Sequence, residues 1–346
     1  MPHYDAVLLV SFGGPEGPAD VLPFLRNVTR GRGIPEERLE EVAEHYHHFG
    51  GVSPINQWCR EVIDALRAEF RASGIDLPVY WGNRNWPPML VDAVTQMTGD
   101  GVRRALAICT SAYGSYSSCR QYVEDINAAR AAVGESAPVI DKVRHFFDHP
   151  GFIGGFASQL RASLDQVEDT SKARVVFTAH SIPDAMEEWS GPEGARYSDQ
   201  VAEAAELVAE HAGWSGPRDV VWQSRSGPPA MPWLEPDIND HLRALASEGV
   251  DTVVVSPVGF LSDHIEVLWD LDNEAAETAA GLGLRYLRAG TPEIGSDLVG
   301  MFRDLVAERV SGAPVKRLGK LPVWDPLVEG CCPARRPPAS EKHRSR

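Results

Sequence analysis

The chain has 346 residues, of which 43% are hydrophobic and 24% are charged, and its 33 basic and 49 acidic residues leave a net charge of −16. This composition is typical of a folded globular protein and excludes a fibrous repeat or a largely disordered chain. The acidic balance disfavours a nucleic-acid partner, because phosphate neutralisation needs a basic face.

Short apolar runs alternate along the chain with amphipathic segments. The runs predict buried strands at residues 6–10, 78–81, 105–108, 175–178, 219–222 and 252–255, with a weaker candidate at 285–287. Helical periodicity occurs in residues 36–48, 57–73, 122–133, 198–211 and 239–248. The strand runs are apolar throughout, as in strands that are covered on both faces. This alternation predicts parallel sheets built from βαβ units.

The strand pattern occurs twice, once before residue 145 and again after residue 170. We predict an α/β fold of two doubly wound, Rossmann-like domains at residues 1–148 and 149–320, with a cleft between them. Residues 321–346 form a C-terminal extension, and its end, rich in Pro, Ser and Arg, is predicted to be disordered. Ligands of such sheets bind beyond the carboxyl ends of the strands, so the polar residues that follow each strand are the candidate site.

The loop after the first strand, Ser11-Phe-Gly-Gly-Pro-Glu-Gly17, matches a dinucleotide-binding turn poorly, so we expect no nucleotide. A tight turn and a ligand-facing loop both remain open. The basic island Thr29-Arg-Gly-Arg-Gly33 suits an anion or is a solvated loop. His45, His47 and His48 cannot all share one helix face, which disfavours a metal site there.

Two strands of the second set are followed by chemically capable side chains. His180 follows residues 175–178, where an imidazole can act as a general base or metal ligand, although a structural role is also common. Glu266, Asp270 and Glu274 follow residues 252–255 at intervals of four, which places three carboxylates in a row on a helix. Such a row attracts hard divalent cations, and a wider π-turn would keep it aligned. The apolar residues 267–269 argue against a merely solvated acidic face.

Two further loops, residues 81–86 and 223–236, combine aromatic side chains with arginine. Flat ring and guanidinium faces suit a planar or an anionic ligand. Ordinary packing of the loops is the alternative.

Together these segments resemble a known family. His180-Ser-Ile-Pro183 and Gly259-Phe-Leu-Ser-Asp-His-Ile-Glu266, followed by Asp270, resemble the two signature segments of ferrochelatases. Further similar segments, in the same order, are Gly50-Gly-Val-Ser-Pro54, Trp222-Gln-Ser224 and Pro232-Trp-Leu-Glu-Pro-Asp237. The resemblance covers residues 4–310 and implies a lyase that inserts ferrous iron (Fe2+) into a porphyrin lying between two Rossmann-like domains, during haem biosynthesis.

The resemblance also assigns roles to residues of this chain. His180 and Glu266 would carry the metallation, facing each other across the porphyrin centre, and Asp270 and Glu274 would relay iron or protons. Porphyrin contacts are implied for Phe12, Arg30, His45, Tyr46, Ser53 and Tyr122. Phe12 stands where some members carry an iron-ligating tyrosine, and His45 replaces an arginine, so only the location of each carries over.

Short bacterial members of this family often use coproporphyrin III, which we therefore expect as the substrate. Protoporphyrin IX is the alternative substrate. Two other readings are a cobalt or nickel chelatase acting on sirohydrochlorin and a tetrapyrrole carrier without catalysis. We expect a cytoplasmic protein, since no apolar run approaches the ~18 residues that span a bilayer and the first ten residues lack the basic segment of a signal peptide. We expect a monomer, because the sequence shows no large unexplained apolar face.

The five cysteines do not form a disulfide framework in a chain of this length. Cys59, Cys109 and Cys119 are predicted to be buried as small hydrophobic residues. Some ferrochelatases hold a [2Fe–2S] cluster with one internal cysteine and three in the C-terminal extension. The extension here offers only Cys331 and Cys332, and residues 188–192 contain no cysteine, so a four-ligand cluster is disfavoured.

Overall fold

A computed structural model of the chain describes residues 2–31, 33–191, 195–226, 230–322 and 331–333. The tail that is predicted to be disordered lies, from residue 334 onwards, outside the described residues, as does Arg32. Within the described ranges, no helix has the length and apolar character needed to cross a membrane.

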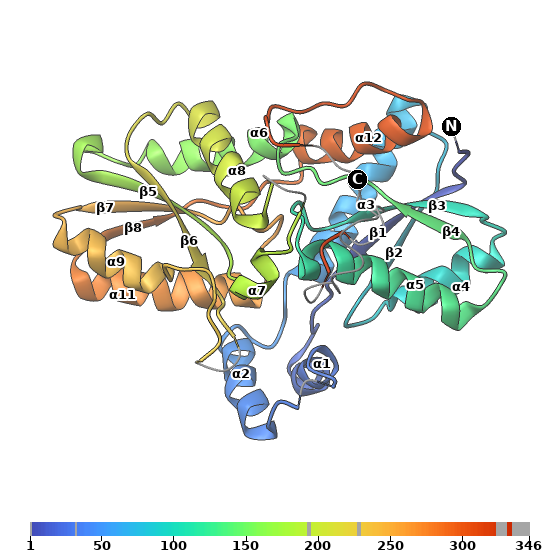
Figure 1. Cartoon of the computed structure of the whole chain (residues 1–346), viewed down its shortest axis with the longest axis horizontal. Helices are drawn as coiled ribbons and strands as arrows, with labels where there is room; N and C mark the ends of the chain where they lie inside the picture. The colour runs from blue at the N-terminus through green and yellow to red at the C-terminus, as the bar shows by residue number, and fades with distance from the viewer. Residues whose placement is uncertain (1, 32, 192–194, 227–229, 323–330, 334–346) are drawn as a thin grey trace.

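Two four-stranded parallel sheets organise the molecule (Figure 1). The first contains β1 (Ala6–Ser11), β2 (Val79–Asn83), β3 (Arg104–Cys109) and β4 (Val139–Lys142), in the order β2-β1-β3-β4. The second contains β5 (Ala173–His180), β6 (Arg218–Gln223), β7 (Thr252–Ser256) and β8 (Arg285–Arg288), in the equivalent order β6-β5-β7-β8. This repeat confirms the predicted fold of two Rossmann-like units, while the domain boundaries at 148 and 320 stay predictions.

Helices flank both sheets. Those nearest the first sheet are α3 (Ile55–Ser73), α4 (Leu90–Gly99) and α5 (Gln121–Val133). Those nearest the second are α6 (Pro150–Leu164), α8 (Tyr197–Ala212), α9 (Ile238–Ser247) and α11 (Ala276–Leu282), with the short α7 (Asp184–Glu187) beyond β5. The last helix, α12 (Ser296–Val310), packs against both α6 and α3 and so joins the two halves. The five predicted helices are confirmed, with their ends displaced by two residues at most.

The short strand β4 was not predicted, because half of it is polar. Asp141 and Lys142 are buried in it. The hydroxyl of Tyr4 donates a hydrogen bond to Asp141 Oδ2 at 2.8 Å, and Arg104 also binds that carboxylate. These distant partners make a polar strand residue tolerable inside the fold.

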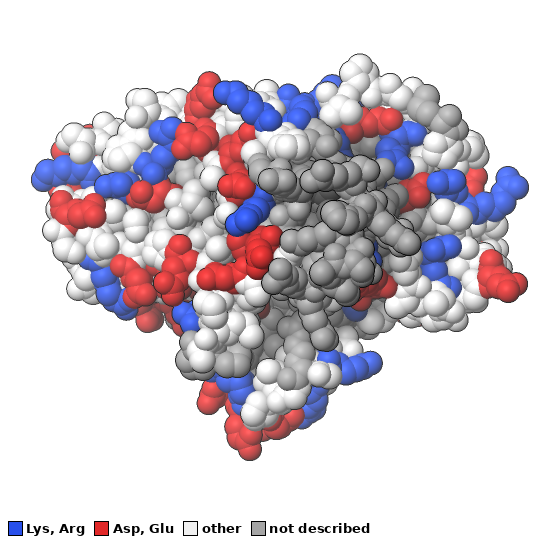
Figure 2. All heavy atoms as spheres, in the orientation of Figure 1, with Lys and Arg blue, Asp and Glu red and all other residues white. Residues whose placement is uncertain are grey.

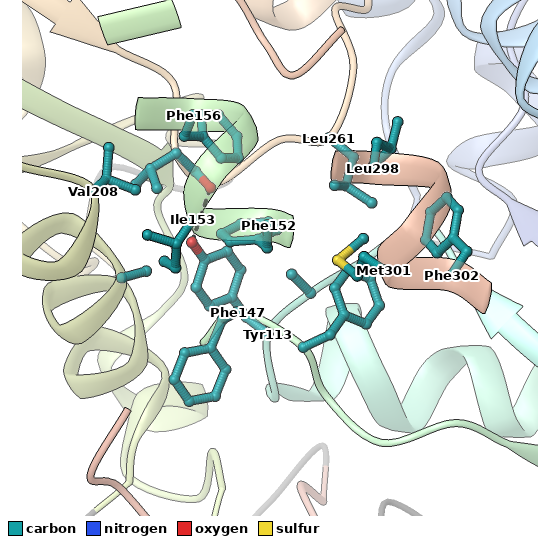
Figure 3. Packing of buried hydrophobic residues seen from close by; sticks show 14 of the residues in the cluster. Tyr113, Phe147, Phe152, Ile153, Phe156, Val208, Leu261, Leu298, Met301 and Phe302 are labelled. Atoms are coloured by element: carbon teal, nitrogen blue, oxygen red, sulfur yellow. Dashed lines mark hydrogen bonds between the residues drawn. The ribbon is translucent and has the colours of Figure 1, made fainter. Parts of the chain in front are cut away.

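The largest hydrophobic cluster among the described residues contains side chains of both halves (Figure 3). Along β1, Val7 and Leu9 face this core while Leu8 and Val10 face α4 and α5, as the two-residue repeat of a strand requires. Tyr113 stands near its centre and donates a hydrogen bond to the carbonyl of Val258 at 2.8 Å. The two lobes are therefore joined by buried side chains as well as by the chain itself.

A helical hairpin projects from the first lobe. It consists of α1 (Val21–Val28) and α2 (Glu36–His48), which lie below the two sheets in Figure 1. Its apolar side chains, including Phe24 and Tyr46, form a cluster with Ile265 of the second lobe. The surface of the lobes carries Lys and Arg side chains interspersed with Asp and Glu among the described residues on the face shown in Figure 2.

Gly259 in the loop after β7 offers a test of the fold. A methyl group there would lie 2.6 Å from Ala179 Cα, at the end of β5, where the backbone cannot yield cheaply. We expect Gly259→Ala to lower the free energy of unfolding by about 1–3 kcal/mol, as overpacking does. The control Gly281→Ala, in α11 with nothing within 4 Å, is expected to gain up to about 1 kcal/mol. Urea denaturation measures both free energies of unfolding. Equal effects of the two substitutions would contradict the close approach of the Gly259 loop to β5.

Candidate active site

His180 is the last residue of β5 and pairs in register with Gln223 of β6. Its ring is half-buried, and Nδ1 lies in hydrogen-bond contact with the carbonyl oxygen of Ser181. A carbonyl can only accept, so Nδ1 must carry the hydrogen. In a neutral ring, Nε2 then keeps its lone pair for a proton or a metal ion.

The acidic segment after β7 adopts the wider turn that would keep its three carboxylates aligned. A short helix, α10 (Ile265–Val267), continues into a π-helix, η4 (Leu268–Ala275). Within it, Asp270 is strongly affected by its neighbours. Burial is the main cause that raises the pKa of Asp270 to about 7, and the carboxylates of Glu266 and Glu274 raise it further. The three carboxylates thus form one interacting row, and we call these three residues the carboxylate row.

The end of β6 holds the middle of this row. Gln223 Nε2 donates to Asp270 Oδ2 at 3.1 Å, and the Ser224 hydroxyl also donates to that oxygen. Ser224 has a φ of 61°, in the left-handed region that residues other than glycine seldom adopt. In the segment Trp222-Gln-Ser224, the second and third residues therefore hold the Asp270 carboxylate in place.

His264 links the two groups expected to carry the chemistry. Burial lowers the pKa of His264, Glu266 and Asp263 oppose that shift, and His180 adds to it. His180 and Glu266, 86 positions apart in sequence, therefore both act on one imidazole. The structure brings them into the same region, and their catalytic roles stay predictions.

The first lobe contributes a set of rings. Phe12 directly follows β1 and is 37% exposed. The guanidinium of Arg84 lies 5.7 Å from the centre of the Phe12 ring and 4.5 Å from that of Tyr122. The ring of Phe24 lies 6.3 Å from Phe12 and 5.8 Å from Tyr46. Three of the predicted porphyrin contacts, Phe12, Tyr46 and Tyr122, are thus connected through two residues that sequence reasoning did not select.

Helix α2 places two of the predicted porphyrin contacts next to the carboxylate row. The His45 ring stacks on Trp269 of the π-helix, with 3.8 Å between ring centres and 6° between planes. Burial raises the pKa of Tyr46, and the nearby Glu266 raises it further. Residues predicted as porphyrin contacts on the first lobe therefore meet the row on the second.

Two further predicted contacts lie at the edge of this region. Ser53 is buried beside Gly14, on which a methyl group would lie 2.6 Å from Ser53 Cβ. Gly13 has a φ of 81° and similarly abuts Asn83, so packing within the chain explains both glycines of this loop. Arg30 is exposed just beyond α1.

Three of the five cysteines lie in contact with one another. Cys59, Cys109 and Cys119 are buried, as predicted. A hydrogen bond with Cys332 lowers the pKa of Cys119, however, and Cys331 Sγ lies 3.3 Å from Cys332 Sγ. Three thiols are one short of the four ligands of a [2Fe–2S] cluster. The thiols present therefore do not fit a cluster. In the described ranges, no group of three or more His, Cys, Asp or Glu side chains, the carboxylate row included, is gathered closely enough to hold a metal ion.

Several residues of this region had weak signals or none. Arg84 lies in the loop at 81–86, which was noted only for its mixture of arginine and aromatic residues. Phe24 lies on the apolar side of α1. Arg288, which binds two carboxylates of the acidic segment, is marked only by its place at the carboxyl end of β8.

These features define a class of protein. Two parallel sheets bring an imidazole and a row of carboxylates from one lobe against a set of aromatic rings from the other. This arrangement suits a flat ligand together with a divalent cation.

Comparison with known proteins supplies the family. Residues 4–310 match the family model for ferrochelatase, and the chain belongs to the ferrochelatase family. A coproporphyrin III ferrochelatase of Nocardia farcinica (strain IFM 10152) is 54% identical over 348 residues, covering 97% of this chain and 99% of that protein. Another, from Mycolicibacterium smegmatis (strain ATCC 700084 / mc(2)155), is 52% identical over 339 residues, covering 96% and 98%.

Solved structures agree on the fold. SirB from Bacillus subtilis with Fe3+ superposes with a TM-score of 0.51 at 11% identity, covering 89% of this chain and 97% of that chain. At this identity the likeness concerns the fold alone. The family match, in contrast, confirms the resemblance to ferrochelatases rather than the alternative of a sirohydrochlorin chelatase.

The raised pKa of Asp270 predicts a pH-dependent stability. The usual Asp value is 3.8 and the folded value is about 7, so ionisation opposes folding as pH rises from the first value through the second. We expect Asp270→Asn to raise the free energy of unfolding by on the order of 2–4 kcal/mol at pH 8 and by far less at pH 4. Urea denaturation at both pH values measures this, with Glu277→Gln on exposed α11 as the control. A gain that is the same at both pH values would contradict the shift.

Proposed function

We propose that this chain inserts Fe2+ into coproporphyrin III, giving iron coproporphyrin III and releasing two pyrrole protons. The observation that carries the proposal is the 54% identity, across 97% of the chain, to a protein named coproporphyrin III ferrochelatase. The arrangement of His180, the carboxylate row and the aromatic rings supports the same chemistry.

The proton chemistry is assigned to His180. Its Nδ1 hydrogen is engaged with the Ser181 carbonyl, so Nε2 is the nitrogen that can accept a pyrrole proton. A general base near neutral pH suits this role, because both the uptake and the later release of the proton are then easy. The neighbouring His264 and Glu266 provide polar groups toward which a proton can leave.

Fe2+ is assigned to the carboxylate row as a substrate in transit. Glu266 and Glu274 are exposed, and Asp270 lies between them with its own hydrogen bonds. Carboxylate oxygens are suitable ligands for a hard divalent cation. A metal that must pass on to a macrocycle is better served by an open set of ligands than by a closed cage, because tight ground-state binding would slow the transfer.

The macrocycle is assigned to the rings of the first lobe. Phe12 has no atom that can ligate iron, so we infer that it contacts the porphyrin through its ring face, together with Tyr46 and Tyr122. Coproporphyrin III carries four propionates, and a protein of net charge −16 repels such an anion overall. Arg30 and Ser53 therefore act as local anchors for propionates.

We further infer that the enzyme works as a monomer in the cytoplasm, without a nucleic-acid partner. Both the rings and the carboxylates come from one chain, so no second copy is needed to complete the site. The acidic net charge opposes phosphate binding.

His180→Ala tests the catalytic assignment. We expect the rate of Fe2+ insertion to fall by at least about 100-fold, because a positioned base supplies about that much, while the dissociation constant for the porphyrin stays within about threefold. The change in the Soret band under anaerobic conditions measures the rate, and quenching of porphyrin fluorescence measures binding. His211→Ala, exposed on α8, is the control. A wild-type protein that binds porphyrin without metallation would be a tetrapyrrole carrier, which contradicts the proposal.

Substrate choice is tested by direct competition. We expect kcat/KM for coproporphyrin III to exceed that for protoporphyrin IX by at least about tenfold, which corresponds to about 1.4 kcal/mol of added binding in the transition state. Arg30→Gln should reduce this ratio, since it removes an anchor for the additional propionates. A ratio of one or less in the wild-type protein would instead favour protoporphyrin IX as the substrate.

A further inference from the structure

The acidic segment, residues 263–274, contains two carboxylates besides the carboxylate row. These are Asp263 and Asp272. Both are bound by one guanidinium, that of Arg288. Its Nη2 and Nη1 both donate hydrogen bonds to Asp263, the latter at 3.3 Å, whereas its Nε forms an ion pair with Asp272, 3.3 Å from Oδ1, without hydrogen-bond geometry. The five carboxylates are therefore divided into two paired with a cation and three that form the row.

The members of the row have neutral partners instead. Asp270 accepts from Gln223 and Ser224, and Glu274 accepts from Trp269 Nε1 at 2.9 Å. No ion pair among the described residues joins Glu266, Asp270 or Glu274 to a lysine or arginine. Within the described part of the chain, the row thus has no lysine or arginine that an incoming cation would have to displace, whereas Asp263 and Asp272 share the single positive charge of Arg288.

Arg288 is well placed to impose this division. It ends β8, and its side chain is only 13% exposed, so the guanidinium is held by the sheet. Asp263 precedes α10, and Asp272 lies inside the π-helix. One rigid, fork-shaped cation therefore ties the entry of the acidic segment to its interior. A π-helix of eight residues is long for this rare conformation, so such external ties matter.

We propose that Arg288 is a positioning residue that keeps Asp263 and Asp272 out of metal binding and aligns the carboxylate row for the divalent cation. Without it, the two freed carboxylates would compete with the row for the metal ion, and the π-helix would lose its tie to the residue that precedes α10. This inference rests on the proposed function, because it names what prepares the metal side of the same site.

Arg288→Met removes the cation and keeps an unbranched side chain of similar reach. We expect the KM for Fe2+ to rise about 10- to 100-fold, as it does when residues that orient metal ligands are lost, while the KM for coproporphyrin III stays within about twofold. In calorimetry with Co2+ and no porphyrin, the variant should bind additional Co2+ per chain compared with the wild type. A purely structural role would raise both KM values and add no Co2+ site.

Two further variants complete the test. Arg285→Met, on the same strand and paired with the exposed Glu168, is the matched control and should leave every readout unchanged. The triple variant Asp263→Asn, Asp272→Asn, Arg288→Met should lose the additional Co2+ site, because its carboxylates are gone. If Arg288→Met fails to fold by circular dichroism, Arg288→Lys takes its place, with a smaller rise in the KM for Fe2+ expected, since an ammonium lacks the fork.

The outcomes separate this inference from the proposed function. A folded variant at position 288 with unchanged Co2+ stoichiometry and unchanged KM for Fe2+ overturns the role of Arg288. A wild-type protein that does not metallate coproporphyrin III overturns the proposed function, and the Co2+ measurements then still decide whether Arg288 controls access to the acidic segment.

Discussion

The mutual repulsion of three carboxylates within one wide-turn helix is the constraint on which the rest of the site depends. Burial of the central carboxylate, and then the like charges on either side of it, disfavour ionisation, which is why the pKa of Asp270 rises to about 7. Contacts within the second lobe offset the free-energy cost of bringing these carboxylates together. The end of β6 gives neutral hydrogen bonds to Asp270, and the end of β8 supplies a cation to the two neighbouring carboxylates. These contacts hold the row in place.

The two lobes contribute different kinds of side chain to the site: the second contributes ionisable groups, and the first contributes aromatic rings. The second lobe carries the imidazole and the carboxylates. The first carries Phe12 and Tyr122, which contact Arg84, and Phe24, which links Phe12 to Tyr46. Helix α2 connects them, since His45 stacks on Trp269 of the π-helix. A macrocycle with an apolar face and a polar centre matches this division, because its face needs rings and its nitrogens need a base and a cation.

Local patterns in the sequence predicted most of the fold and the central residues of the site. Apolar runs predicted strands such as β5 and β7, and the spacing of Glu266, Asp270 and Glu274 indicated a row of carboxylates that only a wider turn keeps aligned. Contacts between distant residues could not be predicted in this way. Arg84 meets Asp125, 41 positions away, and Arg288 meets Asp263, 25 positions away, and neither pair has a local periodicity. Cys119 likewise gives no sign in the sequence of its contact with Cys332.

The electrostatics of the row also bear on the order of events in the proposed reaction. A divalent cation at Glu266 and Asp270 would favour the ionised carboxylates and so lower the pKa of Asp270 from about 7. Asp270 would then give up its proton as the metal ion arrives, and it could not accept a pyrrole proton at the same time. In the proposed reaction the base would therefore be a group other than Asp270, and His180, with Nε2 at the end of β5, meets that requirement. Under that proposal, iron delivery and proton removal fall to different groups, with the row serving the first and the imidazole the second.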